Sequence, residues 1–288
     1  ANIIGKINID RYAPGGFTYG FWMGAQNFII APITLCIGIM LEGSDIWVIS
    51  GGILTGFIAA TAIIQYIFSF KIGQVSRVAP IFSMSPLVVA PLATIFLGES
   101  LSFAAIIAIG MAVIGAALVS WNGGVGNKGH MFVNPVAPLL AFSAAILLGI
   151  AAVLTKSFLD NATFWVYLGA YRLGFGIAMV AITITTNEVR SSISTTLRNR
   201  GFMSLIILEE GILISVAIVV RFAAIKLGPI ALVSAINAAH PAMVFMYSLI
   251  LRHMFPDTFG NWITKGTLHT QAVGIAIITG AVTIICLN

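Results

Sequence analysis

Residues 101–121, LSFAAIIAIGMAVIGAALVSW, form a run without a charged side chain. A helix that crosses a bilayer needs about 20 predominantly apolar residues, so this run is long enough to span a membrane. The composition of the whole chain agrees: of 288 residues, 59% are hydrophobic and 8% are charged, and the mean hydropathy is +1.05. A soluble domain carries about 25% charged residues. The sequence therefore predicts an all-α integral membrane protein and excludes soluble enzymes and nucleic-acid-binding modules.

Apolar runs of this kind recur along the chain between clusters of Gly, Pro, Asp and Asn. A short run at 1–9 predicts the end of a truncated first helix, which further N-terminal residues are expected to precede. Full spans are predicted near 17–41, 46–70, 77–97, 101–121, 135–158, 163–186, 202–226, 229–255 and 269–287. We therefore expect about ten transmembrane helices.

The connections between these spans divide the chain into two halves. A Gly-rich linker at 123–134 separates residues 1–122 from residues 135–288. Residues 186–201 are expected to form the only sizeable polar loop.

The two halves resemble each other when the chain is aligned with itself. One shift places Lys71-Ile72-Gly73 on Lys226-Leu227-Gly228, and the same shift places Pro86 on Pro241. If each half holds five helices, an odd number, the second copy enters the membrane in the opposite direction. Two inverted five-helix repeats are typical of transporters, whose substrate site lies at the repeat interface near the membrane midplane.

Several segments carry a resemblance to a known family. In the first half they are Pro86 through Leu97-Gly98-Glu99-Ser100, Ile109-Gly110 and Ile114-Gly115-Ala116-Ala117-Leu118, and in the second half Thr155-Lys156-Ser157-Phe158-Leu159 and Tyr171-Arg172. Together they are similar to the EamA domain of the drug/metabolite transporter superfamily. The resemblance implies ten helices in two inverted repeats, and transport of small organic solutes by alternating access.

The chain also departs from this family pattern. Gln26 stands in the first half where the second has Arg172, and residues 252–270 replace the Leu-Gly-Glu turn in the second half.

Polar side chains inside predicted spans are the candidate site residues, because such groups are costly in lipid. The predicted substrate contacts are Gln26, Gln65, Tyr66, Ser83, Ser85, Arg172, Arg221, Asn237 and His240. The guanidinium groups of the two arginines offer a planar fork that suits a carboxylate or a phosphate, although a structural ion pair is the alternative. His240 follows Asn237 by three residues and directly precedes a proline, although a histidine in a helix is also commonly structural.

Glu209 and Glu210 are the acidic residues predicted to lie well inside a span, about two turns into the eighth helix. A carboxyl group in lipid is a natural proton carrier, so both are candidates for proton coupling. The alternative is an ion pair with Arg172 or Arg221. Adjacent helical positions point about 100° apart, so the two carboxyl groups are expected to face different partners.

We therefore expect a secondary transporter, a permease or exporter of small organic metabolites such as amino acids or related compounds. The alternatives are an organophosphate or nucleotide-sugar exchanger and a membrane-embedded enzyme acting on a lipid. No catalytic residue, metal or cofactor is expected. The expected partners are a small-molecule substrate and the lipid bilayer, not nucleic acid, and the chain is expected to be a monomer or homodimer in the bacterial inner (plasma) membrane.

The orientation in the membrane is open at this point, because two arguments disagree. Most basic loop residues, including Arg190, Arg198 and Arg200, fall on one side of the predicted topology. The positive-inside rule then places the C-terminus outside the cytoplasm. The resemblance to EamA domains instead implies that both termini lie in the cytoplasm.

Overall fold

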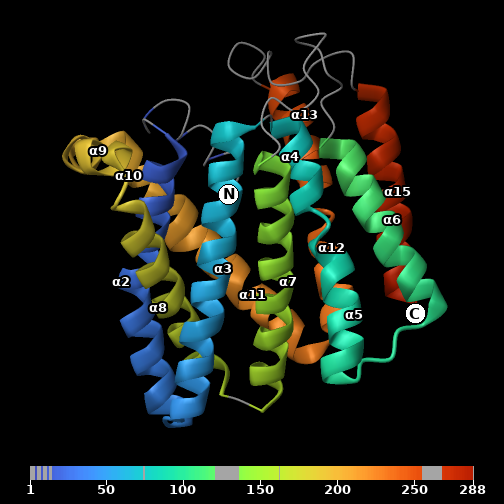
Figure 1. Cartoon of the computed structure of the whole chain (residues 1–288), viewed down its shortest axis with the longest axis horizontal. Coiled ribbons are helices and arrows are strands. Elements are labelled where there is room, and N and C mark those ends of the chain that lie inside the picture. The colour runs from blue at the N-terminus through green and yellow to red at the C-terminus, as the bar shows by residue number, and fades with distance from the viewer. Residues whose placement is uncertain are drawn as a thin grey trace. The chain divides into compact units, whose positions relative to one another are not determined.

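A computed structural model describes residues 4, 8, 12, 15–73, 75–120, 136–161, 163–254 and 268–287 (Figure 1). Within these residues the regular structure is helical, and no strand occurs among them. Most of the predicted stub at 1–9, the linker at 123–134 and most of the insertion at 252–270 lie outside the described residues.

Each full span predicted from the sequence is a helix, whole or interrupted. The bounds are α2 Gly16–Glu42, α3 Ile46–Ile72, α4 Val75–Phe82 followed by α5 Ser85–Leu97, α6 Phe103–Ser120, α7 Val136–Asn161, α8 Phe164–Thr183, α10 Arg200–Ile206 continuing through the π-helix η1 Ile207–Leu213 into α11 Ile214–Leu227, α12 Ile230–Asn237 followed by α13 His240–Met254, and α15 Leu268–Leu287. Among the described residues, 8 helical stretches are long and apolar enough to cross a membrane, and Phe103–Val119 is a shorter apolar helix. The predicted all-α membrane fold is confirmed.

The prediction of a polar loop at 186–201 is wrong, because most of it is helix α9, Asn187–Arg198. Its buried side chains, Val189, Ser192 and Thr196, recur at intervals of three and four and so share one face. The hydroxyl oxygen of Thr186 accepts a hydrogen bond from the Val189 N–H at 3.4 Å and caps the first turn. A search for apolar runs misses such a helix, because its polar residues outnumber its apolar ones.

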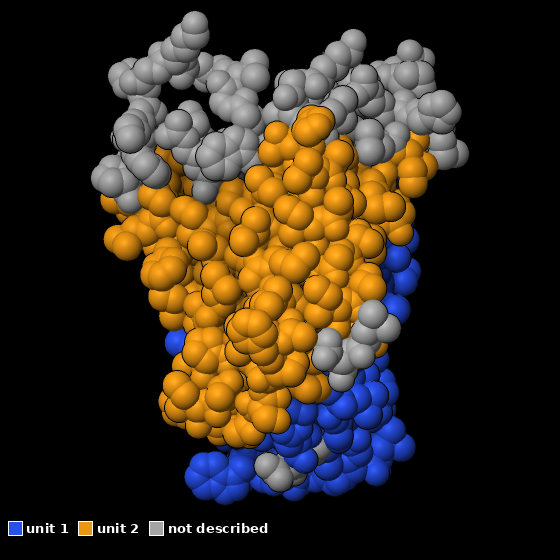
Figure 2. All heavy atoms as spheres, turned by 90° about the vertical axis from the view of Figure 1, so that its right-hand side faces the viewer, with its two compact units in different colours: residues 1–67, 150–228 blue, residues 68–149, 229–288 orange. Residues whose placement is uncertain are grey.

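The described helices form two compact units, shown in different colours in Figure 2. Unit 1 comprises Ala1–Ile67 and Ile150–Gly228, and unit 2 comprises Phe68–Gly149 and Pro229–Asn288. Unit 1 takes one segment from each predicted sequence half, whereas the first segment of unit 2 continues past the linker into the second half as far as Gly149. Unit 1 contains the second and seventh spans, α2 and α8, whereas unit 2 contains the fifth and tenth, α6 and α15.

In unit 1, α2 and α8 pack against each other and run antiparallel (Figure 1). Small residues allow this approach: a Cβ on Gly24 would clash with Met179 and meet the backbone of Val180, and a Cβ on Gly176 would clash with the backbone of Phe28. Close packing through small residues is the usual way in which helices associate in lipid. The spacing of Gly20 and Gly24, which such packing requires, is visible in the sequence.

In unit 2, α6 and α15 are also packed antiparallel. Gly115 of α6 lies against Gly274 of α15, and the side-chain amide of Gln271 donates to the carbonyl oxygen of Val119 at 3.4 Å. Later residues of α6 therefore meet earlier residues of α15. In both units, equivalent spans of the two predicted repeats pair in opposite directions, as inverted repeats require.

Candidate functional site

The fourth span is interrupted in unit 2 between α4 and α5, at Ser83 and Met84. The hydrogen bonds there span three residues, whereas those of an α-helix span four. The N–H of Met84 donates to the carbonyl oxygen of Ile81 at 3.1 Å, and that of Leu87 donates to the carbonyl oxygen of Met84 at 2.9 Å. Pro86 has no N–H and cannot donate to the carbonyl oxygen of Phe82, four residues earlier. The proline accounts for the break.

The ninth span is interrupted in the same way between α12 and α13, at Ala238 and Ala239. The N–H of Ala239 donates to Ile236 at 2.9 Å, and that of Ala242 donates to Ala239 at 3.0 Å. The shift that aligns Pro86 with Pro241 also aligns each of these bonds with its counterpart in the fourth span. The two breaks therefore lie at corresponding positions of the two predicted repeats and share the same hydrogen-bond pattern.

Four predicted substrate contacts lie at these breaks. Ser83 and Ser85 flank the first, whereas Asn237 and His240 flank the second and are exposed. The hydroxyl of Ser83 donates to the carbonyl oxygen of Ala79 at 3.0 Å, so it is engaged within its own helix. Backbone that leaves the helical pattern at membrane depth is tolerated only where protein covers it or where it lines a water-filled cavity.

Unit 1 holds a second polar cluster, built around Arg172 of α8. This side chain is 1% exposed, and its guanidinium donates to Oδ1 of Asn27 at 3.3 Å and to the carbonyl oxygen of Ser215 at 3.4 Å. Arg172 therefore joins α2, α8 and α11. Its Nε is buried and has no hydrogen-bond partner among the described residues.

Glu209 and Glu210 lie in the same unit on η1, and each is 2% exposed. The hydroxyl of Tyr19 donates to Oε1 of Glu210 at 3.1 Å, and the Glu209 carboxyl group also interacts with that hydroxyl. The expectation that the two carboxyl groups face different partners is wrong. It assumed α-helical geometry, whereas the wider π-helical turn brings both toward Tyr19. Single π-helical turns inside α-helices are frequently found at functional sites.

The remaining predicted contacts of unit 1 surround this cluster. Gln26 is half-buried, and its Oε1 lies beside Gly211 of η1. Tyr171 interacts electrostatically with both Arg172 and Arg221, and its ring lies 4.9 Å from that of Phe222 in an edge-to-face arrangement. Gln65 and Tyr66 are half-buried on α3 of the same unit.

Sequence reasoning missed two members of the cluster, Tyr19 and Asn27. Asn27 is a polar residue inside a predicted span, so the rule applied to Gln26 could have found it. Tyr19 lies near the start of its span, where an aromatic residue is expected to sit at the membrane interface.

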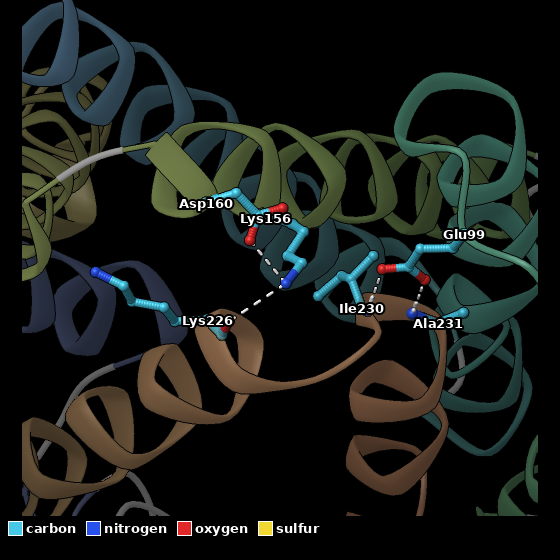
Figure 3. Close-up of polar contacts among 6 residues, drawn as sticks. All are labelled: Glu99, Lys156, Asp160, Lys226, Ile230 and Ala231. Atoms are coloured by element: carbon cyan, nitrogen blue, oxygen red, sulfur yellow. Dashed lines mark hydrogen bonds and ion pairs between the residues drawn. The ribbon is translucent and has the colours of Figure 1, made fainter.

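The Leu97-Gly98-Glu99 turn, which the family resemblance singled out, has a visible role in unit 2. Gly98 closes α5 with a positive φ of 67°. The Glu99 carboxylate then accepts hydrogen bonds from the N–H groups of Ile230 at 2.7 Å and Ala231 at 3.3 Å, at the start of α12 (Figure 3). A carboxylate is favourable there because the first N–H groups of a helix lack helical partners.

Lys156 has a comparable structural role in unit 1. Its ammonium group pairs with Oδ1 of Asp160 at 2.8 Å and donates to the carbonyl oxygen of Lys226 at 3.4 Å, at the end of α11 (Figure 3). A cation is favourable at the C-terminus of a helix.

Residues 2–121 match the EamA-like transporter family. This part of the chain is an EamA domain. EamA domains belong to the drug/metabolite transporter superfamily, whose members are transporters and not enzymes. The chain is thus a multi-pass integral membrane protein whose residues 2–121 are similar to a transporter family of this type.

The EamA match covers the first predicted repeat, and solved structures extend the likeness to the whole chain. One of them, titled "Crystal structure of protein", is 17% identical, with a TM-score of 0.70 over 99% of this chain and 91% of its own. At this identity the likeness shows the fold alone. Among curated proteins, none matches the chain.

Proposed function

We propose that the chain is a secondary transporter that moves small organic metabolites, amino acids or related compounds, by alternating access. The observation that carries this proposal is the pair of equivalent breaks, between α4 and α5 and between α12 and α13. In transporters built from inverted repeats, interrupted helices at corresponding positions of the two halves mark the substrate site.

The chemistry at the breaks favours a substrate with an amino group. Pro241 has no N–H to donate to the carbonyl oxygen of Asn237, four residues earlier, which leaves an acceptor for an ammonium group. The amide of Asn237 and the imidazole of His240 add side-chain partners. In this proposal the residues Gln26, Gln65, Tyr66, Arg172 and Arg221 remain candidate contacts in unit 1, as do Ser83, Ser85, Asn237 and His240 in unit 2.

A counterflow screen in proteoliposomes tests the proposal. Vesicles preloaded with unlabelled amino acids, nucleosides or sugar phosphates are presented with the labelled compound outside. We expect exchange of one or more amino acids. Asn237→Ala should reduce that exchange at least tenfold, whereas Thr94→Ala should not. Thr94 is an exposed residue of α5 whose hydroxyl bonds only to its own helix among the described residues.

Two results of the screen would contradict the proposal. Exchange of sugar phosphates without exchange of amino acids would favour the organophosphate or nucleotide-sugar alternative. If Asn237→Ala and Thr94→Ala reduced exchange equally, the breaks would not contribute to substrate binding. We further propose that the chain works as a monomer or homodimer in the bacterial inner membrane, which fractionation and cross-linking in native membranes would test.

A further inference from the structure

The helix α9, Asn187–Arg198, joins two membrane-spanning helices of unit 1, and neither the breaks nor the cluster around Arg172 includes it. The span α8 ends at Thr183 and the next span begins at Arg200, so only a few residues separate α9 from a span on either side. Its 12 residues form a helix about 18 Å long, which is too short to cross a bilayer core of about 30 Å. Both ends of α9 therefore lie at the same membrane surface.

Hydrogen bonds to the first turns of α2 fix which face of α9 points inward. The hydroxyl groups of Thr18 and Ser192 lie 2.9 Å apart, and the indole N–H of Trp22 donates to the hydroxyl oxygen of Thr196 at 3.0 Å. Val189, on the same face, packs in a core cluster with residues of α2, α3 and α8. Figure 1 shows α9 at the upper end of α2. The opposite face of α9 is therefore turned away from unit 1.

The outward face of α9 carries two arginines and one apolar residue. Four exposed residues define it: Arg190, Ser194, Leu197 and Arg198. At 100° per residue, these positions fall within about 100° of the helix circumference. Arg200, which is also exposed, adds a third guanidinium group two residues after the helix ends. The outward face is thus basic.

The guanidinium groups of this face are available to a ligand. No hydrogen bond or ion pair joins the side chain of Arg198 or Arg200 to another described residue. The Nε of Arg190 donates to the carbonyl oxygen of Ile184 at 2.9 Å, and its Nη groups bind no described acceptor. Glu188, the acidic residue of α9, accepts hydrogen bonds from the first N–H groups of α2 and so is directed toward unit 1.

The phosphate of a phospholipid is the group that fits this face. A guanidinium group binds phosphate with two parallel N–H donors, and basic residues close together attract an anionic membrane surface. Leu197 is 56% exposed beside the arginines, and a soluble phosphate ion would gain nothing from this apolar neighbour. A phospholipid offers phosphate and acyl chain together, at the depth where a surface helix lies.

We propose that the outward face of α9 binds the headgroup phosphates of anionic phospholipids through Arg190, Arg198 and Arg200, while Leu197 contacts the acyl chains. A lipid bound there holds α9 against the first turns of α2, to which its inward face is hydrogen-bonded. Lipid binding at this face does not rest on the proposed transport function.

Fluorescence quenching by labelled lipids tests the proposal in the full chain. With Cys36 and Cys286 replaced, a bimane fluorophore is attached to Ser194→Cys in phosphatidylcholine vesicles. The quenchers are phosphatidylglycerol and phosphatidylcholine, each with a nitroxide on the acyl chain near the headgroup and added in equal small amounts. Each arginine near an anionic surface strengthens binding about fivefold. We therefore expect phosphatidylglycerol to quench with an apparent affinity at least about fivefold higher than phosphatidylcholine.

Matched variants assign this preference to the arginines. Arg198→Gln/Arg200→Gln should remove most of it, whereas Arg198→Lys/Arg200→Lys should retain part of it, because the charge remains and the planar fork is lost. Ser191→Gln/Thr195→Gln is the control, since both residues are exposed on α9 outside the basic face. It should keep the full preference. Bimane on Ser50→Cys, near the start of α3 and the opposite end of α2, should show no preference.

Several outcomes would overturn the proposal. They are equal quenching by the two lipids at Ser194→Cys, a preference that survives Arg198→Gln/Arg200→Gln, and an equal preference at Ser50→Cys. Displacement of labelled phosphatidylglycerol by inorganic phosphate, but not by chloride at the same ionic strength, would assign the face to a soluble anion instead. If the Gln variant does not fold, salt provides the test without a variant at these arginines. Raising NaCl from about 0.05 M to about 0.5 M should weaken the preference by screening, and an unchanged preference would contradict an electrostatic site.

Discussion

Glu42 and Glu188 make reciprocal contacts between α2 and α8. Each follows or ends one of the two helices and accepts a hydrogen bond from an N–H group at the start of the other. Glu42, at the end of α2, accepts a hydrogen bond from the N–H of Trp165 at the start of α8, at 2.9 Å. Glu188, just after α8, accepts one from the N–H of Phe17 at the start of α2, at 3.1 Å. The shift that pairs Gln26 with Arg172 also pairs these two glutamates. The two contacts are thus reciprocal, which is the arrangement that the predicted inverted repeats require.

This reciprocity predicts two independent contributions to stability. Replacing either glutamate with Ala removes the capping carboxylate and should lower the free energy of unfolding by about 1–2 kcal/mol. The helix α2 has 27 residues and is about 40 Å long, so the two caps are too far apart to interact. The double variant should therefore show the sum of the single effects to within about 0.5 kcal/mol, measured by unfolding in detergent. Strong non-additivity would refute independent capping, and Ser50→Ala, an exposed change, is the control.

Two glycines should respond in opposite ways to the same substitution. A Cβ on Gly56 of α3 would clash with the carbonyl oxygen of Tyr171, a backbone atom that cannot rotate away. Gly56→Ala should therefore prevent α3 from packing against α8 and yield little folded protein. A Cβ on Gly110 of α6 meets no described atom within 4 Å. Gly110→Ala should be neutral or stabilise by up to about 1 kcal/mol. Size-exclusion chromatography and thermal unfolding compare them, and similar behaviour would contradict the packing of α3 on α8.

Arg172→Lys should destabilise unit 1 although it keeps the charge. The guanidinium reaches Asn27 and Ser215 at once, whereas an ammonium group lacks the planar fork that allows this. Loss of one charged hydrogen bond should cost about 1.5–3 kcal/mol. A double-mutant cycle with Asn27→Ala measures the contact directly, because Arg172→Lys should cost much less when Asn27 is already Ala. Equal costs in the two backgrounds would show that this hydrogen bond does not contribute.

Arg221→Lys tests a functional role for the second arginine. If Arg221 binds an anionic group of the substrate, the variant should exchange substrate with at least tenfold weaker affinity at normal expression. The expected result rests on the planar fork, since the charge is retained. Wild-type affinity would make Arg221 a structural residue, in keeping with its position beside Tyr171.

Labelling on α9 settles the orientation. We expect α9 to lie outside the cytoplasm, because the family resemblance implies that both termini are cytoplasmic. The Nε of Arg190 donates to the carbonyl oxygen of Ile184 at the end of α8, so this arginine has a structural role and counts less as a positive-inside signal. Ser194 is exposed and suits a Ser194→Cys variant, whereas Ser192 is buried against Thr18. With Cys36 and Cys286 replaced, an impermeant thiol reagent added to intact cells should label the variant. Labelling only after permeabilisation would support the positive-inside argument instead.

The spans could be predicted because lipid imposes a minimum length of apolar sequence. The two breaks could be located because Pro86 and Pro241 remain in register between the halves. The reciprocal glutamates could not be found in this way, because each binds a helix start more than a hundred residues away and no local pattern marks such a contact. Glu209 and Glu210 were found, but their shared partner was not, since a helical wheel assumes regular α-helix where the chain forms η1.

The capping of α2 by Glu188 also bears on how the chain is made. During synthesis, α2 reaches the membrane well before residue 188 has been translated. The first N–H groups of α2 therefore lack their carboxylate acceptor until the second half of the chain has been made. The same holds for every contact between α2 and α8. The first half synthesised alone would thus leave the surface of α2 open to chaperones and membrane proteases. Supplying the second half as a separate polypeptide should protect it.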